Sequence, residues 1–227
     1  MKTTDFAVIF DMDGVIFDSE RAYIDSFRVI CEEEGIPFIE QACIDCIGAN
    51  WNRSKVIFEE AYGEDFDFPH YYDLVRKRLG TLQFDLKPGV HEIFEFLEER
   101  DIPIALASST SKNSVMRMLS EEGMLTTFDV IVCGDMVTHS KPHPEIFLTA
   151  AEKLGVAPEN CYVIEDSFNG IRCAHNAGMH PVMVPDILQP DDEIRGLAQV
   201  VLPSLNEAIE FLGNCYEASN ESTPTTF

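Results

Sequence analysis

The hydrophobic positions of this chain gather into five short runs, each bounded by polar or turn-forming residues. The runs cover residues 6–10, 102–107, 130–133, 161–164 and 181–184. Such runs, without alternation, are typical of strands buried on both faces of a parallel sheet. Helix-length amphipathic segments lie at residues 90–100, 111–122, 144–154 and 169–177. Because strands that alternate with helices form βαβ units, we expect an α/β fold with a Rossmann-like parallel sheet core.

One interval, residues 19–84, breaks this alternation and carries only helical patterns. Its four amphipathic segments lie at residues 21–34, 39–47, 53–61 and 71–82, and Pro88-Gly89 marks the return to the sheet. We therefore expect an α-helical cap over residues 18–85, inserted into an α/β catalytic core of residues 1–17 and 86–215. The polar, proline-containing segment 216–227 is expected to be a flexible tail.

The composition narrows the range of partners. The formal charge of the 227-residue chain is −24, which opposes electrostatic binding to nucleic acid or to an anionic membrane. No stretch is apolar enough for a membrane span or a cleaved signal peptide. Seven scattered cysteines fit a reducing cytoplasm, and we read Cys43 and Cys46 as partly buried thiols rather than as a zinc or redox pair. We expect a cytoplasmic monomer.

The first strand ends in two acids, Asp11 and Asp13, followed by Gly14. Ligands of open α/β sheets bind at the carboxyl ends of the strands, which is where this pair lies. Two neighbouring carboxylates cannot both ionise cheaply unless a cation shares the site or one keeps a proton. Taken alone, the pair is also compatible with an ordinary Asp-Gly turn.

Polar groups follow the next three strands as well. Hydroxyls, expected to be exposed, begin at Ser108, Lys141 lies on a proline-stiffened loop, and Glu165-Asp166 follow the fourth strand. Small hydroxyl residues at a helix start suit phosphate, and paired carboxylates suit magnesium. Helix capping alone would explain a hydroxyl or Asp166, each taken separately. It does not explain why acids recur at the ends of two different strands. His143 we read as a turn or surface residue near a helix start.

Together, the four strand ends carry Asp11-Met12-Asp13-Gly14-Val15, Ser108, Lys141 in Lys141-Pro142-His143-Pro144, and Glu165-Asp166. Their order and contexts resemble the haloacid dehalogenase superfamily over nearly the whole chain. The helical insertion further resembles the subfamily with an α-helical cap, which includes phosphoglycolate phosphatase-like and β-phosphoglucomutase-like enzymes. The resemblance implies the fold of that superfamily, with the cap inserted between the first two motifs.

The resemblance also implies a mechanism. Asp11 would attack phosphorus and become an aspartyl phosphate, while Asp13 would protonate the leaving oxygen and then deprotonate the attacking water. Ser108 and Lys141 would bind the phosphoryl oxygens. An acid at position 13 is what phosphotransferases use, so dehalogenase activity is not expected.

A magnesium ion is implied as the cofactor. Its ligands would be the Asp11 carboxylate, the Asp13 backbone carbonyl and Asp166, while Glu165 would orient bound water. Mg²⁺ would offset the repulsion between an attacking carboxylate and a phosphate dianion.

Substrate choice is expected to depend on the cap, because a closing lid completes the site. In the cap, Arg53 is a candidate for contact with an anionic or hydroxylated group of the substrate, and Trp51 either stacks on a sugar or packs the cap core. Residues expected to contact substrate are Gly14, Ser109, Asn169 and Arg53.

The expected activity is hydrolysis of a small phosphorylated metabolite, such as a sugar or polyol phosphate. A β-phosphoglucomutase-type mutase is the main alternative, but the place of its cap-hinge histidine is taken by Tyr23. This departure favours water as the final acceptor. A non-catalytic metabolite-binding regulator is a more remote alternative, because every catalytic position holds a chemically competent residue.

Overall fold

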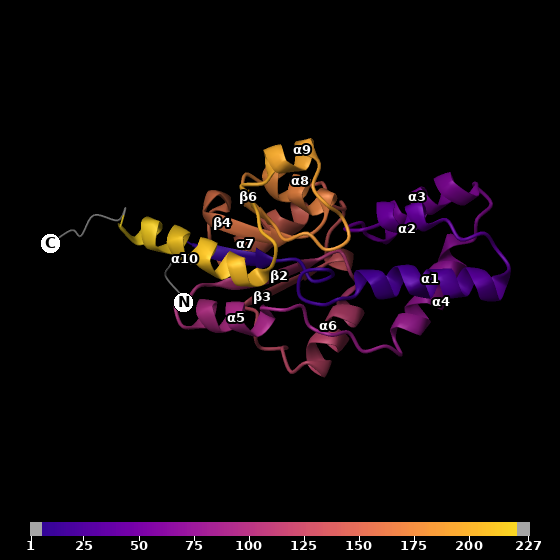
Figure 1. Ribbon diagram of the computed structural model, residues 1–227, viewed down its shortest axis with the longest axis horizontal. Helices are drawn as coiled ribbons and strands as arrows, with labels where there is room; N and C mark the ends of the chain where they lie inside the picture. Colours follow the sequence, from indigo (N-terminus) through magenta and orange to yellow (C-terminus); the bar gives the residue numbers. More distant parts are fainter. Residues whose placement is uncertain (1–5, 222–227) are drawn as a thin grey trace.

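A computed structural model describes residues 6–221 as an α/β core that carries a helical cap at one end (Figure 1). Six parallel strands form one sheet in the order β3-β2-β1-β4-β5-β6. The strands are β1 (Ala7–Phe10), β2 (Ile104–Ser108), β3 (Val130–Cys133), β4 (Cys161–Glu165), β5 (His180–Met183) and β6 (Val200–Val201). Because β1 is flanked by β2 and β4, their carboxyl ends meet at the centre of one sheet edge.

Helices cover both faces of the sheet. One face carries α5 (Val90–Glu98), α6 (Lys112–Glu121) and α10 (Leu205–Glu221), and the other carries α7 (Glu145–Leu154) and α8 (Phe168–Asn176). Helix α9 (Asp192–Leu197) packs beside α8, and two 3-10 turns lie at Gly134–Met136 and Pro158–Asn160. Alternate residues of β1 enter the two cores, Val8 on one face and Ile9 on the other, as the strand period of two requires.

The expected fold class is confirmed, and all five expected strands form. Strand β6 escaped detection because it has only two residues. The expectation of a flexible tail from 216 is wrong for residues 216–221, which continue α10. That helix buries Ala208 and Leu212 against the core, and Tyr216 packs beside them. The polar residues on its other face made the apolar face hard to recognise in the sequence. Residues 222–227 of the expected tail lie outside the described part of the chain.

The cap consists of α1 (Glu20–Glu34), α2 (Glu40–Asp45), α3 (Trp51–Tyr62) and α4 (Phe68–Leu79), which pack around their own aromatic-rich core. Two of these helices begin before their expected starts because of capping. The Asn50 side chain accepts a hydrogen bond from the amide of Arg53, and the Asp67 side chain accepts one from that of His70. Such caps satisfy amides that have no partner inside the helix.

The chain enters and leaves the cap through two paired segments. The amide of Asp18 donates a hydrogen bond of 3.0 Å to the carbonyl of Asp85. The amide of Lys87 donates one of 2.8 Å to the carbonyl of Ile16. The Lys87 ammonium lies 2.9 Å from Asp186 of the core and 3.6 Å from Asp18. Both connections therefore sit beside the sheet edge where β1 ends.

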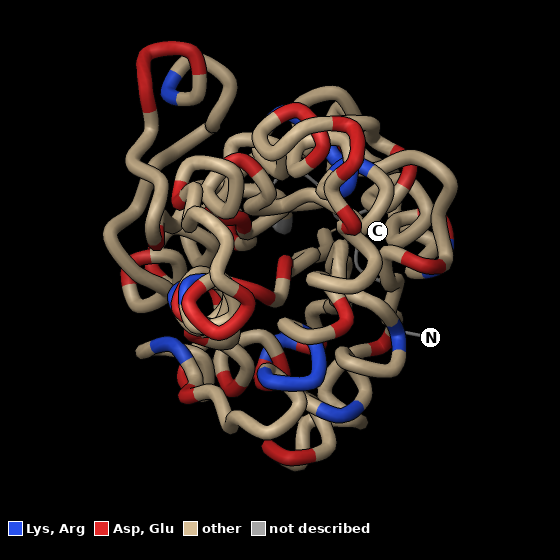
Figure 2. The backbone as a smooth tube through the Cα atoms, turned by 90° about the vertical axis from the view of Figure 1, so that its right-hand side faces the viewer, with Lys and Arg blue, Asp and Glu red and all other residues tan. Residues whose placement is uncertain are grey.

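Viewed from the cap end, the molecule carries many more acidic than basic residues (Figure 2). Within residues 6–221, no helix combines the length and the apolar character needed to cross a membrane.

Candidate active site

Asp11 and Lys141 form a buried ion pair directly beyond β1. The Lys141 Nζ lies 2.6 Å from Asp11 Oδ1, 2.6 Å from Glu165 Oε1 and 3.2 Å from the carbonyl oxygen of Ala107. Burial raises the pKa of Asp11 to about 7, although Lys141 opposes that rise. Burial alone would lower the pKa of Lys141, but its two carboxylate partners outweigh this and raise it, so the side chain is an ammonium at neutral pH.

Three carboxylates gather at this site, and two of them contact the Lys141 ammonium. Oxygens of Asp11, Glu165 and Asp166 lie within 4.8 Å of one another, and all three residues are buried. Both oxygens of Glu165 have partners, one being Lys141 and the other the amide and hydroxyl of Ser167. Asp166 Oδ2, in contrast, is buried without a hydrogen-bond partner. Burial, followed by the nearby Glu165 charge, raises the pKa of Asp166 well above its usual value.

The donor set fits a hard divalent cation. Excess negative charge and an unpartnered buried oxygen are what a Mg²⁺ ion would neutralise, and the ligands are all oxygen. The backbone at Gly14 keeps this space open, with φ of +76°. A Cβ at this position would lie 2.2 Å from Asp166 Oδ2.

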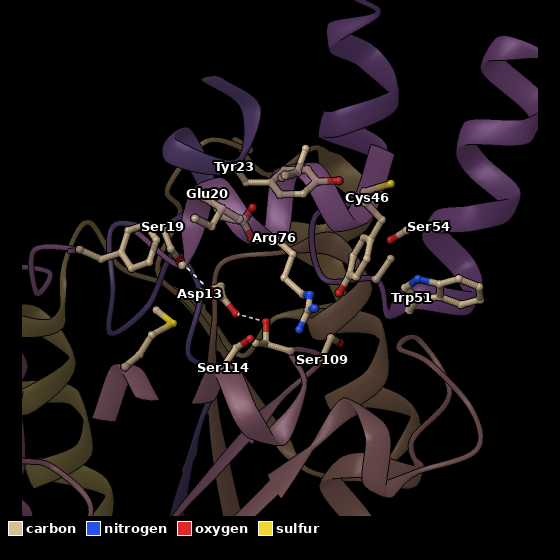
Figure 3. Close-up of a pocket in the computed structure, with 18 of the residues that line it drawn as sticks. Asp13, Ser19, Glu20, Tyr23, Cys46, Trp51, Ser54, Arg76, Ser109 and Ser114 are labelled. Carbon is tan, nitrogen blue, oxygen red and sulfur yellow. Dashed lines mark hydrogen bonds between the residues drawn. The ribbon is translucent and has the colours of Figure 1, made fainter. Parts of the chain in front are cut away.

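Asp13 points away from this cluster and into a hydroxyl-lined environment. Its Oδ1 accepts a hydrogen bond from Ser19 Oγ at 2.6 Å, and its Oδ2 accepts one from Thr110 Oγ1 at 2.7 Å (Figure 3). Ser108 Oγ donates a longer bond of 3.3 Å to the same oxygen. The two acids that stand two apart in the sequence thus have separate surroundings.

The Ser108 hydroxyl is completely buried, contrary to the expectation of an exposed group. Besides contacting Asp13, it accepts a hydrogen bond of 3.0 Å from the amide of Thr110, which tightens the turn after β2. As a result, Ser109 and Thr110 are the hydroxyl residues of this turn that line the cavity.

A cavity of about 440 Å³ separates the cap from the core above Asp11 and Asp13. The core side includes Ser109, Thr110, Asn113, Ser114 and Arg117, and the cap side includes Tyr23, Trp51, Tyr72, Arg76 and Lys77. Trp51 packs against Phe68 and Tyr72 of the cap, as one of its two expected roles requires. It also lines the cavity, and stacking on a sugar stays a prediction. The cavity is thus lined by carboxylates, which include Asp11 and Asp13, and by the cations Arg76, Lys77 and Arg117.

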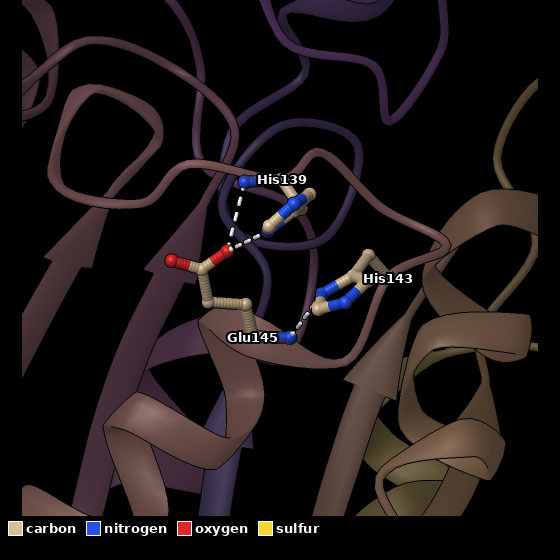
Figure 4. A group of neighbouring side chains, drawn as sticks. All are labelled: His139, His143 and Glu145. Carbon is tan, nitrogen blue, oxygen red and sulfur yellow. Dashed lines mark hydrogen bonds and ion pairs between the residues drawn. The ribbon is translucent and has the colours of Figure 1, made fainter.

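The loop that carries Lys141 is fixed from outside by Glu145. The carboxylate of Glu145 accepts hydrogen bonds from the amides of Thr138, at 2.9 Å, and His139, at 2.8 Å, and it lies 2.7 Å from His139 Nδ1 (Figure 4). These bonds lower the pKa of Glu145 to about 2. His143 is exposed just before α7, which confirms its reading as a surface residue near a helix start.

The cap loop 47–50 is hydrogen-bonded to the core through its own backbone. Ser109 Oγ donates to the carbonyl of Gly48 at 3.0 Å, the amide of Asn50 donates to Ser140 Oγ at 2.9 Å, and Asn169 Nδ2 donates to the carbonyl of Ile47 at 3.3 Å. The donors and acceptors on the core side follow β2, β3 and β4. The cap is therefore closed over the sheet edge.

The structure brings the expected catalytic and metal-binding residues together, but not all of the expected substrate contacts. Of the four residues expected to contact substrate, only Ser109 is among the described residues that line the cavity, whereas Gly14 lies against Asp166. Asn169 instead contacts the cap loop, and Arg53 lines shallower hollows on the outer side of the cap–core junction. Their predicted substrate contacts stay predictions.

Sequence reasoning missed Thr110, Glu20 and the two arginines of the cavity. Burial raises the pKa of Glu20 well above its usual value, and the charge of Asp13 adds to this effect. One signal was available for Arg76, because residues 76–78 are the only adjacent basic residues in this acidic sequence. Arg117 had no such signal, since it lies in an ordinary amphipathic helix.

Comparison with known proteins agrees with this geometry. The model of the haloacid dehalogenase-like hydrolases matches residues 8–184. The chain is 35% identical over 179 residues to a phosphorylated carbohydrates phosphatase of Thermotoga maritima, which covers 78% of this chain and 83% of that protein. It is 28% identical over 209 residues to hexitol phosphatase B of Escherichia coli, with 88% and 93% covered.

A solved structure of a putative β-phosphoglucomutase from Thermotoga maritima is also similar, with a TM-score of 0.72 and 32% identity. The similarity covers 92% of this chain and 99% of that one. The family model, the close relatives and the order of the four motifs agree: the chain belongs to the haloacid dehalogenase-like hydrolases.

Proposed function

We propose that the protein is a magnesium-dependent phosphatase that hydrolyses a small phosphorylated carbohydrate, a sugar or polyol phosphate. The observation that carries this proposal is the buried Asp11, held by Lys141 beside the unpartnered oxygen of Asp166 at the base of a closed cavity. Two relatives whose names state phosphorylated carbohydrate and hexitol phosphatase activity support the substrate class.

In the proposed reaction, an Asp11 carboxylate oxygen attacks phosphorus while the bond between phosphorus and the substrate oxygen breaks. Asp13 gives a proton to that leaving oxygen, so the alcohol departs neutral. The resulting carboxylate of Asp13 then takes a proton from water, whose oxygen attacks phosphorus and releases Asp11. Hydrogen bonds from Ser19 and Thr110 hold Asp13 in position for both transfers.

Mg²⁺ would be held by Asp11, Asp166 and the backbone carbonyl of Asp13, with Glu165 orienting its water. When bound, it supplies positive charge that neutralises the phosphoryl group. Lys141 contributes a second, permanent positive charge next to Asp11. Ser109 and Thr110 line the side of the cavity where phosphoryl oxygens would lie.

A mutase of the β-phosphoglucomutase type is the second candidate, because solved structures similar to this chain carry that name. Tyr23 argues against it. This side chain lines the cavity, and burial raises the pKa of its phenol well above the usual value, so it does not exchange protons as an imidazole does. We therefore assign water as the final acceptor.

We also propose that the protein acts as a monomer in a reducing cytoplasm. One chain supplies both walls of the cavity, and all seven cysteines are free.

The deciding experiment compares the wild type with Asp11→Asn on a panel of sugar and polyol phosphates, with MgCl₂ or with EDTA. We expect phosphate release only from the wild type with Mg²⁺, and an unchanged circular dichroism spectrum for the variant. Asp45→Asn, on the cap surface, is the matched control. Retention of a tenth of the turnover by Asp11→Asn contradicts the assignment of the nucleophile.

β-Glucose 1-phosphate incubated with a trace of glucose 1,6-bisphosphate separates the two candidates. The phosphatase proposal predicts inorganic phosphate as the main product. Faster accumulation of glucose 6-phosphate identifies a mutase instead.

A further inference from the structure

We propose that Arg76 of the cap and Arg117 of the core together bind a second anionic group of the substrate. The preferred substrate is then a phosphorylated carbohydrate that also carries a carboxylate or another phosphate. This inference rests on the proposed phosphatase function, because it concerns the part of the substrate that is not transferred.

The first argument is the placement of positive charge. The chain has 16 basic residues against 40 acidic ones, yet Arg76, Lys77 and Arg117 all line the one cavity above Asp11 and Asp13. Lys141 cannot serve a distal group, since it is buried below the cavity and paired with Asp11 and Glu165. In a molecule that otherwise repels anions, three cations on the cavity wall create a local attraction.

The second argument is how the two arginines are held. Arg76 Nη2 donates to Asp73, one turn earlier on α4, at 3.0 Å, and Arg117 Nη1 contacts both oxygens of Glu121, one turn later on α6, at 2.9 Å. Each guanidinium carries five N–H donors, so one bonded nitrogen fixes its direction and leaves donors for a ligand. Carboxylates and phosphates match this planar fork.

The third argument is direction. Figure 3 shows Arg76 extending from the cap into the cavity, toward Asp13 and Ser109. Arg117 enters the same cavity from the core helix that follows the Ser109 turn. Asp13 and Glu20 also line the cavity and would repel a second anion placed beside them, so such a group is directed toward the arginines. Since the two cations come from cap and core, an anion between them also favours closure.

A matched pair of substrates tests this arrangement. sn-Glycerol 1-phosphate and D-3-phosphoglycerate have the same spatial arrangement at C2 and differ only at the end of the three-carbon chain far from the phosphate, where the first carries a hydroxymethyl group and the second a carboxylate. For the wild type, we expect kcat/KM for phosphoglycerate to exceed that for glycerol phosphate by about tenfold, the equivalent of about 1.4 kcal/mol. Arg76→Gln and Arg117→Gln should bring this ratio close to one, mainly through KM.

Arg78→Gln is the control, because Arg78 is exposed in the same basic run but is not among the described residues that line the cavity. It should leave the ratio unchanged. Arg76→Lys, which keeps the charge but loses the fork, should recover part of the ratio, and thermal melts should show that all variants fold.

The outcomes separate the two proposals. A wild-type ratio below about three, or a ratio that neither Arg76→Gln nor Arg117→Gln reduces, overturns the arginine site while phosphatase activity stands. If the wild type releases phosphate from no phosphomonoester of the panel, the proposed function itself fails.

Discussion

The two walls of the cavity are built in different ways. On the core side, Asp11 lines the cavity above Lys141 and Glu165, and these three residues are buried with charged or backbone partners that allow one position. On the cap wall, Arg76 and Trp51 are partly exposed and stand on helix surfaces. The two sides of the cavity therefore suit different tasks. Buried groups with fixed partners suit a reaction that needs one geometry, whereas exposed helix positions tolerate substitution and suit the choice of substrate.

The largest expected effect comes from filling the space that the core wall keeps open. Gly14→Ala places a methyl group 2.2 Å from Asp166 Oδ2 at a φ of +76°. We expect turnover to fall by about a hundredfold or more, because the variant must displace the Asp166 carboxylate, which we propose as a magnesium ligand. Phosphate release at saturating Mg²⁺ measures the loss.

Gly35→Ala is the control, since Gly35 has a similar φ of +68° and open space around its Cβ position. It should cost about 1 kcal/mol of stability and leave turnover unchanged. Similar turnover losses in both variants would mean that backbone strain, and not the metal site, causes the effect.

Asp166→Asn tests whether the carboxylate cluster lowers the stability of the metal-free protein and at the same time allows it to bind metal. Burial and the nearby Glu165 raise the pKa of Asp166, so folding without metal must either bury its charge or take up a proton, and both cost stability. Asn avoids both costs, so the metal-free variant should melt at a higher temperature than the metal-free wild type. At the same time, the stabilisation by MgCl₂ should disappear. Thermal melts with EDTA and with MgCl₂ give both values, and a lower melting temperature of the metal-free variant would contradict the idea.

The stability of the metal-free protein should depend on pH. The pKa of Asp11 is raised to about 7, so between roughly pH 4 and pH 7 the folded state holds a proton that the unfolded chain has released. Stability therefore falls as pH rises through this range, by up to about 1.4 kcal/mol per pH unit. In the proposed site, Mg²⁺ would take the place of this proton, so its stabilising effect should be larger at pH 8 than at pH 5. A magnesium effect that is equal at both values would refute this linkage.

The smallest expected effect belongs to Arg53, which lies outside the cavity. Arg53→Gln should change kcat/KM for the best substrate by less than about threefold, which corresponds to about 0.6 kcal/mol. A tenfold rise in KM would instead restore the sequence-based expectation that Arg53 contacts substrate, and would show that the cap adopts another position during turnover.

This contrast also explains how far sequence reasoning reached. The ends of adjacent parallel strands must meet, so Asp11, Lys141 and Asp166 could be grouped once the strands were recognised. The direction of a cap side chain depends on how four helices pack, which the pattern does not specify. Arg53 was therefore preferred to Arg76, although both stand on amphipathic helices. Burial of Ser108 was likewise hidden, because it depends on the turn formed by Thr110.

The hydrogen bonds that hold the cap loop on the core affect how the sequences of such proteins can change during evolution. Its three bonds to the core use the carbonyls of Ile47 and Gly48 and the amide of Asn50, which every substitution except proline preserves. Two of these residues are constrained for other reasons: a Cβ at Gly48 would lie 2.4 Å from Ser167 Oγ, and the Asn50 side chain caps α3. Side chains of the cap can therefore change during evolution while these backbone bonds keep the cap closed over the core. New substrates can then be acquired without changes to the catalytic residues of the core.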